Sequence, residues 1–205
     1  IFYKIKRYNK RQIMKTEFHR INRLPSYVFA ETNKLKAEFR ENGNDVIDFG
    51  MGNPDLNTED FIVEKLIETA KKPKTHRYSV SKGIKGLRKA QAEYYKTRFS
   101  VKLDPETEVI ATLGSKEGLA NLAQAITSKG DKILCPDPSY PVHPYGFTIA
   151  GAKLIPLKTI YNGEFNPQKY LINIERNIKK NSKIKALIVS FPSNPTAQIV
   201  NIDFY

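Results

Sequence analysis

Three loops in this sequence carry side chains suited to binding a ligand, and each follows a stretch predicted to be a β-strand. The first contains Gly114, Ser115 and Lys116, where the glycine permits a tight turn and the serine caps the following helix. The free backbone N–H groups of that helix, the hydroxyl and the ammonium group could together bind an anion such as a phosphate. An ordinary capped connection between strand and helix has the same composition, so this stretch alone leaves both interpretations open.

The other two loops present an aromatic ring and an amide. Tyr140 lies in the proline-rich stretch CPDPSYPVHPYG, where it could stack on a flat ring or simply pack beneath the loop. Asn194 follows an apolar strand and precedes Pro195, which favours extended backbone at the asparagine. Its amide can donate to one atom and accept from another, although an Asn-Pro turn would serve equally well as an explanation.

The three loops are expected to lie at the same edge of one sheet. Because the carboxyl ends of parallel strands meet at one edge of a sheet, the anion-binding turn, the tyrosine and the asparagine are expected there together. Such a set suits a flat, phosphorylated ring that carries a hydroxyl group, and pyridoxal 5'-phosphate fits that description. No metal site is predicted, because His143 lacks a His, Asp or Glu partner at ligand spacing and is interpreted as a structural or surface residue.

The elements that must position these loops alternate along the second half of the chain. Strands are predicted at 46–55, 108–114, 131–136, 153–159 and 184–192. Helices are predicted at 26–40, 58–72, 83–99, 115–128, 145–152 and 166–180, the second of them capped by Thr58. Apolar strands separated by helices indicate an α/β fold, in which helices flank a mostly parallel sheet on both faces.

Composition narrows the class of protein further. The 205 residues are 40% hydrophobic, which suits one globular domain or one domain with part of another. No apolar run reaches the roughly 18 residues of a membrane span, and no secretory signal is recognisable. The single cysteine, Cys135, excludes an internal disulfide and favours a reducing, cytoplasmic setting. The net charge of +13 is mostly dispersed lysine and is interpreted as solvated surface, not as a nucleic-acid-binding patch.

Six motifs in order resemble one family. They are EFHRINRLPSYVF, DFGMGNPD, RYSVSKGIKGLR, TLGSKEGLANLA, PDPSYPVH and FPSNPTAQ. From about Met14 to residue 200 the sequence resembles the N-terminal half of a class I/II aminotransferase of fold type I, closest to the alanine and LL-diaminopimelate aminotransferase branch. The resemblance implies pyridoxal 5'-phosphate as cofactor and an amino group transferred between an L-amino acid such as alanine and a 2-oxo acid.

The resemblance also implies roles for individual residues. Gly114, Ser115 and Lys116 match the family's phosphate-binding turn, Tyr140 the ring that stacks on the pyridine, and Asn194 the amide that binds the phenolic oxygen.

Two further matches concern the substrate and the subunit partner. Tyr78 matches a tyrosine that reaches the cofactor of the neighbouring subunit, which implies a homodimer. Gly52 matches the loop that closes over the substrate carboxylate. Ala197 departs from the family's usual glycine, at a cost of about 1 kcal/mol if its φ is positive.

A larger departure concerns catalysis. The family's Schiff-base lysine, its aspartate on the pyridine nitrogen and its arginine for the substrate carboxylate all follow the NPT motif, after which this sequence has only AQIVNIDFY. The expected chain is therefore a fragment without a catalytic residue, poorly soluble and inactive alone. The alternatives are a non-catalytic remnant or binding protein, or another fold type I enzyme such as a lyase or synthase.

The domain organisation follows from the same resemblance. Residues 1–13 are expected to be a basic arm, for which two interpretations stay open: upstream sequence translated in frame, because Met14 opens a stretch typical of a natural start, or a disordered arm of the protein. Residues 14–50 are expected to form the N-terminal arm and a helix of the small domain, and 51–205 an incomplete large cofactor-binding domain.

Overall fold

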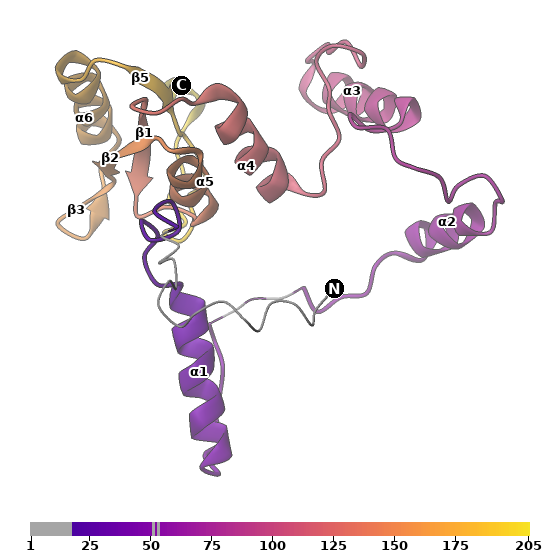
Figure 1. Cartoon of the computed structure of the whole chain (residues 1–205), viewed down its shortest axis with the longest axis horizontal. Helices are drawn as coiled ribbons and strands as arrows, with labels where there is room; N and C mark the ends of the chain where they lie inside the picture. The colour runs from indigo at the N-terminus through magenta and orange to yellow at the C-terminus, as the bar shows by residue number, and fades with distance from the viewer. Residues whose placement is uncertain (1–17, 51, 53) are drawn as a thin grey trace, which may run out of the picture. The chain divides into compact units, whose positions relative to one another are not determined.

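A computed structural model describes residues 18–50, 52 and 54–205 of the chain (Figure 1). Two compact units are formed, one by residues 26–115 and the other by 116–205 together with the N-terminal segment that ends at Pro25. The basic arm predicted at 1–13 and the start predicted at Met14 lie outside the described residues, and the predicted domain limits stay predictions.

The 116–205 unit contains helices and strands in the order expected from the sequence. In the 26–115 unit, all of the described elements are helices. This unit contains α1 (Val28–Glu41), α2 (Asp60–Ala70) and α3 (Lys85–Phe99). From there the chain continues through α4 (Ser115–Ile126), β1 (Lys132–Asp137), α5 (Val142–Ala150), β2 (Lys153–Lys158), β3 (Ile160–Tyr161), β4 (Glu164–Phe165), α6 (Pro167–Lys180), β5 (Ile184–Leu187) and a 3-10 turn at Ile202–Phe204.

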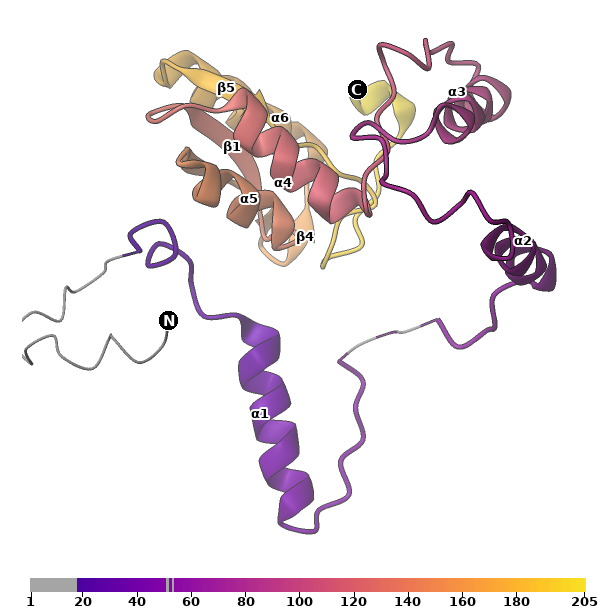
Figure 2. The ribbon, with the colours of Figure 1, turned by 45° about the vertical axis from the view of Figure 1, so that its right-hand side comes forward.

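A parallel sheet organises the 116–205 unit, as predicted. Its strand order is β2-β1-β5, so β1 is the central strand. Both of its neighbours run parallel to it, with Leu134 opposite Ile155 on one side and Leu187 on the other. Helices α4 and α5 lie on one face and α6 on the other, which can be followed in Figures 1 and 2. The predicted α/β architecture is therefore confirmed for this unit.

Alternation along β1 divides the core of this unit in two. Ile133 points to the face covered by α4 and α5, where it packs with Ala123, Phe147 and Ala152. The next residue, Leu134, points to the opposite face and packs with the buried side chains of β2 and α6, which are Leu157, Tyr170 and Ile174. Successive residues of a strand face opposite sides, so one short apolar strand supplies both cores.

Two predicted strands are absent from the described structure. Segments 108–114 and 46–55 have no strand pairing in their described residues. Both lie in the 26–115 unit, whose described elements are helices, and an extended segment becomes a strand only when a neighbour accepts its backbone hydrogen bonds. Two large apolar side chains of the first segment, Ile110 and Leu113, remain exposed, Leu113 to 92%.

Local predictions also needed correction. Helix α2 is preceded by Glu59 as its N-cap, not by Thr58, and the cap residue makes no side-chain hydrogen bond. Helix α5 begins at Val142, three residues before the predicted boundary at 145. The antiparallel pair β3–β4 was not predicted, because its strands are only two residues each.

A buried arginine organises the 26–115 unit. The Arg88 side chain in α3 donates from Nε to the Pro105 carbonyl oxygen at 2.8 Å and from Nη1 to the Gly83 carbonyl oxygen. Its Nη2 lies 2.7 Å from a Glu106 carboxylate oxygen. These contacts satisfy the hydrogen-bonding groups of the buried guanidinium. They also connect the segment before α3, at Gly83, and the segment after it, at Pro105 and Glu106, to the helix.

Within the described part of the chain, no helix has the length and apolar character required to cross a membrane.

Candidate functional site

The carboxyl edge of the sheet brings together two of the predicted loops. Strands β1 and β5 are parallel neighbours, so the chain leaves both of them at the same edge. The first exit leads from Asp137 to Tyr140, and the second leads from Leu187 to Asn194. The backbone N–H of Ile188 still donates to the Leu134 carbonyl oxygen at 2.9 Å, which keeps the two exits side by side at their start.

Tyr140 is half-buried and contacts two ionisable side chains. The Lys116 Nζ atom lies 5.6 Å from the centroid of the Tyr140 ring, a cation–π contact between α4 and the β1 exit. The His143 ring meets the Tyr140 ring edge-on, with centroids 6.0 Å apart and planes at 80°. The structure therefore joins a residue of the predicted phosphate-binding turn to the predicted stacking ring.

His143 has a clearer role in the structure than in the sequence. Its backbone N–H donates to the Tyr140 carbonyl oxygen at 3.0 Å, within the turn that leads into α5. The imidazole is half-buried, burial lowers its pKa, and its Nδ1 atom has no hydrogen-bond partner among the described residues. We interpret His143 as a residue that positions the tyrosine. The spacing of three residues between Tyr140 and His143 in a helix-opening turn was the signal that could have indicated this contact.

The turn before α4 has the backbone geometry expected of an anion-binding loop. Gly114 has φ +86°, in the left-handed region that favours glycine. The Thr112 hydroxyl donates to the Gly114 carbonyl oxygen at 3.0 Å, and the helix begins at Ser115 itself. Ser115 and Lys116 are both exposed, so their polar atoms are accessible to a ligand. Phosphate binding by this turn stays a prediction.

A serine that the sequence analysis overlooked shapes the loop that presents Asn194. The Ser193 hydroxyl accepts from the backbone N–H of Gln198 at 2.8 Å and lies 2.9 Å from the Thr196 hydroxyl. Its backbone N–H donates to the Gln198 carbonyl oxygen at 2.9 Å, and its carbonyl oxygen accepts from Ala197 at 2.7 Å. This closed loop leaves Asn194 exposed at the sheet edge, and its side-chain amide takes no part in these hydrogen bonds. Serine before an Asn-Pro turn was the available signal.

Ala197 has φ +53°, which confirms the strain expected at this departure from glycine. Ala197→Gly is therefore expected to raise the free energy of unfolding by about 1 kcal/mol, because glycine adopts positive φ without a Cβ clash. Denaturant unfolding followed by circular dichroism would measure this. Ala186→Gly in β5 is the matched control and should lower the same free energy by about 0.5–1 kcal/mol. Equal losses in both variants would contradict the assignment of strain to Ala197.

The two remaining predicted site residues lie in the 26–115 unit. Tyr78 is fully exposed at 104% and Gly52 is exposed too. Their roles toward a partner subunit's cofactor and toward the substrate carboxylate stay predictions.

The one cysteine of the chain is buried at the exit of β1. Its thiol lies 3.5 Å from the Ser139 hydroxyl. Burial raises the pKa of the Cys135 thiol, so it remains protonated and a poor nucleophile. Cys135 is thus a packing residue beneath the loop that carries Tyr140.

Comparisons with known proteins agree on one family. The family model of aminotransferase class I and II matches residues 44–205. The glutamate-pyruvate aminotransferase AlaC of Escherichia coli (strain K12) is 48% identical over 189 residues, 92% of this chain and 45% of the relative. The LL-diaminopimelate aminotransferase of Aquifex aeolicus (strain VF5) is 43% identical over 188 residues, 91% of this chain and 47% of the relative.

A solved structure gives the same answer for the fold. A single mutant of the Thermus thermophilus aspartate aminotransferase matches with a TM-score of 0.81 and 27% identity, covering 93% of this chain and 48% of that one. The chain thus spans about half the length of the relatives it matches. Because the family model matches most of the chain, and the parallel sheet and its loops agree with it, the chain belongs to the class I and II aminotransferases.

Proposed function

We propose that this chain forms part of a pyridoxal 5'-phosphate-dependent aminotransferase, which transfers an amino group between an L-amino acid such as alanine and a 2-oxo acid. The observation that carries the proposal is the contact between Lys116 and Tyr140, at the sheet edge from which Asn194 is also presented. The family is pyridoxal phosphate-dependent.

The side chains at this edge fit the chemistry of that cofactor. Pyridoxal phosphate has a dianionic phosphate, a flat pyridine ring and a phenolic oxygen. The turn at Ser115 and Lys116 supplies exposed donors and a positive charge for the phosphate. The half-buried Tyr140 supplies a ring for stacking and the exposed Asn194 an amide for the phenolic oxygen.

Each residue would then have a simple task. When bound, the cofactor supplies the electron sink that allows a proton to leave the substrate's α-carbon. Ser115 and Lys116 would fix the phosphate end, and Tyr140, braced by His143, would fix the plane of the ring. Asn194 would hold the phenolic oxygen and so set the rotation of the ring about the phosphate.

The partner and the setting of the protein belong to the same proposal. The fully exposed Tyr78 supports a homodimer in which this ring reaches the partner's cofactor, and Gly52 would lie in the loop near the substrate carboxylate. The buried, protonated Cys135 thiol supports a reducing, cytoplasmic setting. Lys116 is assigned to the phosphate and is not proposed to bind the cofactor covalently, so the 205-residue chain assayed alone is expected not to transaminate.

A chimaera tests the proposal directly. Residues 14–205 of this chain would replace the matching part of Escherichia coli AlaC, and transfer between glutamate and pyruvate would be measured together with the Kd for pyridoxal phosphate. We expect an active chimaera in which Asn194→Ala raises that Kd about tenfold, because a hydrogen bond to a charged oxygen contributes roughly 1.5–3 kcal/mol.

Asn201→Ala removes an equally exposed asparagine outside the site and is the matched control, with an expected Kd unchanged within twofold. A chimaera that has the circular dichroism spectrum of AlaC but binds no pyridoxal phosphate would rule out the proposed cofactor site.

A further inference from the structure

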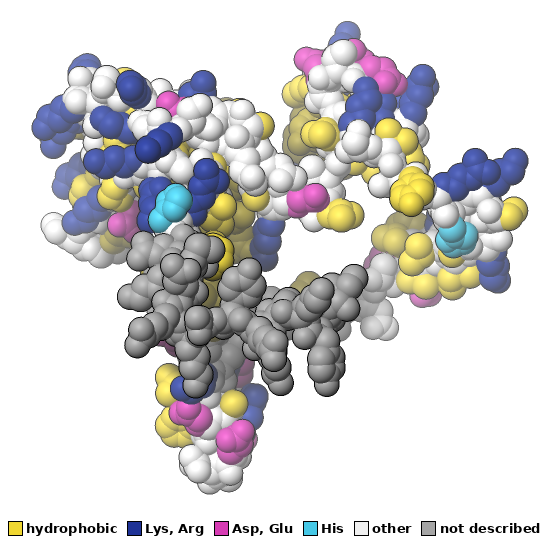
Figure 3. Space-filling view, in the orientation of Figure 1, with side chains coloured by type: hydrophobic (Ala, Val, Ile, Leu, Met, Phe, Trp, Pro, Cys, Tyr) yellow, Lys and Arg dark blue, Asp and Glu magenta, His cyan; other side chains and the backbone are white. Residues whose placement is uncertain are grey.

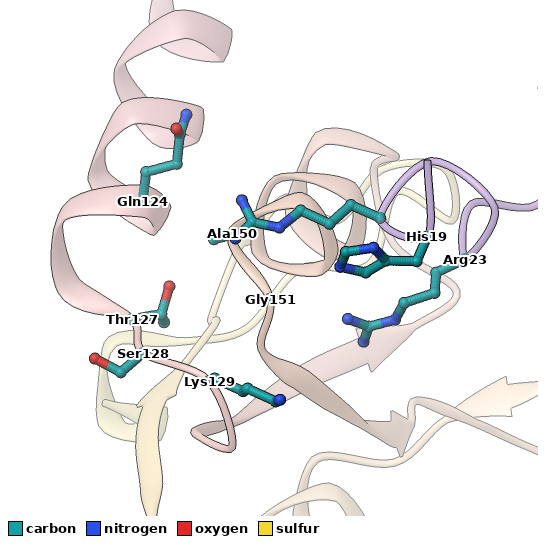
Figure 4. Close-up of a pocket in the computed structure, with 9 residues that line it drawn as sticks. His19, Arg23, Gln124, Thr127, Ser128, Lys129, Ala150 and Gly151 are labelled. Atoms are coloured by element: carbon teal, nitrogen blue, oxygen red, sulfur yellow. The ribbon is translucent and has the colours of Figure 1, made fainter. Parts of the chain in front are cut away.

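A second concave site lies at the opposite edge of the sheet. It is a pocket of about 440 Å³ within the unit that contains residues 116–205 (Figure 4). Its walls are the turn before α1, the ends of α4 and α5, and the loop that follows α4. The lining residues are His19, Arg20, Arg23, Gln124, Thr127, Ser128, Lys129, Ala150 and Gly151.

The position of this pocket separates it from the proposed cofactor site. Lys129 precedes β1 and Gly151 precedes β2, so the pocket lies where the strands begin, whereas Tyr140 and Asn194 lie where strands end. The Arg23 Nη2 atom donates to the Ala152 carbonyl oxygen at 2.8 Å, which anchors the N-terminal turn at this edge.

The pocket gathers positive charge. Figure 4 shows the side chains of His19, Arg23 and Lys129 directed toward the space beside Gly151. The lining includes no carboxylate, and neither Arg20 nor Lys129 forms an ion pair with any residue that the structure describes. Figure 3 shows that Lys and Arg side chains are frequent over the α6 side of this unit as well, where Lys158, Lys169 and Arg176 line another pocket of about 490 Å³. There, however, both lysines already make cation–π contacts with the Tyr161 ring, and the lining contains no serine or threonine hydroxyl.

Neighbouring negative charge does not balance these cations. Helices α4 and α5 both end at the pocket, and two helix C-termini together contribute about one negative charge. Asp131 adds another, although its carboxylate already accepts from the Ser128 backbone N–H at 2.9 Å. Two arginines and a lysine carry three positive charges, so an excess remains even before the imidazole is counted.

We propose that this pocket binds a small molecule that carries a diphosphate group. Guanidinium groups pair with phosphate oxygens in a bidentate manner, and the ammonium group of Lys129 adds a point charge. The Ser128 side chain offers a hydroxyl donor, whereas the Thr127 hydroxyl already donates to the Ala123 carbonyl oxygen. The volume is within the range of small-molecule sites and exceeds what a single phosphate needs.

Equilibrium dialysis of the 205-residue chain with inorganic pyrophosphate tests this proposal, with ionic strength held constant by sodium chloride. Arg20→Gln/Lys129→Gln should weaken binding at least tenfold. Arg176→Gln/Lys185→Gln removes the same two residue types outside the pocket and should change binding less than twofold. Far-UV circular dichroism of both double variants must match that of the parent chain, which shows that a loss of binding is not a loss of folding.

A second dialysis series with ADP distinguishes the sources of the diphosphate. Equal affinity for ADP and pyrophosphate would identify the diphosphate as the recognised group, and tighter binding of ADP would add a contact to the nucleoside. Three outcomes would overturn the proposal: binding of neither probe, equal losses in the two double variants, or a loss of pyrophosphate binding in Lys116→Gln with none in Arg20→Gln/Lys129→Gln. The last outcome would place the anion at the cofactor site, and because the cofactor test reads pyridoxal phosphate affinity, the two proposals can fail separately.

Discussion

Leu134→Ala is expected to lower the free energy of unfolding of the 116–205 unit by about 3–5 kcal/mol. The side chain has no exposed surface and lies on the central strand between Leu157, Tyr170 and Ile174. The hydrogen-bonded neighbours β2 and β5 hold β1 in place on both sides, so the core cannot close around the lost volume. The variant should therefore lose both the transfer free energy of the removed side-chain atoms and the free energy of the cavity that they leave.

Urea unfolding followed by circular dichroism at 222 nm measures this loss, and Leu122→Ala provides a control of the same chemistry. Leu122 lies on α4 in the same unit but is half exposed, so its truncation should cost about 1 kcal/mol. If the two variants lost equal stability, β1 would not be the centre of the core. The substitution is also expected to affect the proposed cofactor site, because β1 leads directly into the loop that carries Tyr140.

Alkaline pH is expected to destabilise the same unit through one tyrosine. Tyr170 is fully buried, its hydroxyl has no hydrogen-bond partner among the described residues, and burial raises its pKa to about 12 from 10.0. Between these values the unfolded chain releases the phenolic proton while the folded chain keeps it. The unfolded state then binds fewer protons, so stability falls as pH rises. The contribution begins to be lost near pH 10, and about 2 kcal/mol of it is lost by pH 12.

Unfolding free energies of the parent chain and of Tyr170→Phe at several pH values between 9 and 12 isolate this contribution from that of the other tyrosines and the lysines. Tyr170→Phe should keep about 2 kcal/mol that the parent loses by pH 12, and it should be as stable as the parent or more so at pH 8, since it removes an unsatisfied hydroxyl. Tyr205→Phe, at an exposed ring, should follow the parent. Parallel curves for all three proteins would show that the Tyr170 hydroxyl is not buried in solution.

The apolar surface of the described chain bears on any such measurement. Phe49, Leu56 and Leu113 are each more than 85% exposed, and the helices of the 26–115 unit expose further large apolar side chains. Contiguous exposed apolar surface favours association. Poor solubility of the 205-residue chain alone therefore stays a prediction, and the unfolding studies call for a low protein concentration.

Much of this protein was determined by its sequence alone. The six helices, the three parallel strands and the position of the site loops follow from local patterns, because helix periodicity, β-branched runs and glycine or proline turns act over a few residues. The resemblance also indicated that a positive φ at Ala197 would cost about 1 kcal/mol, and the structure has φ +53° there. Motif order was enough to indicate the aminotransferase family.

Other features were decided only by the tertiary structure. Segment 108–114 has the composition of a strand but is not one, because strand formation depends on a hydrogen-bonded partner that local sequence does not specify. The contact of Lys116 with Tyr140 and the ion pair of Arg88 with Glu106 join residues that are far apart in the sequence. The basic pocket likewise combines residues from positions 19 to 151, because α4 and α5 pack in one core and the N-terminal turn is hydrogen-bonded through Arg23 to Ala152, just before β2. Local sequence preferences determined where helices and strands form. The burial and pairing of whole elements determined which side chains come into contact.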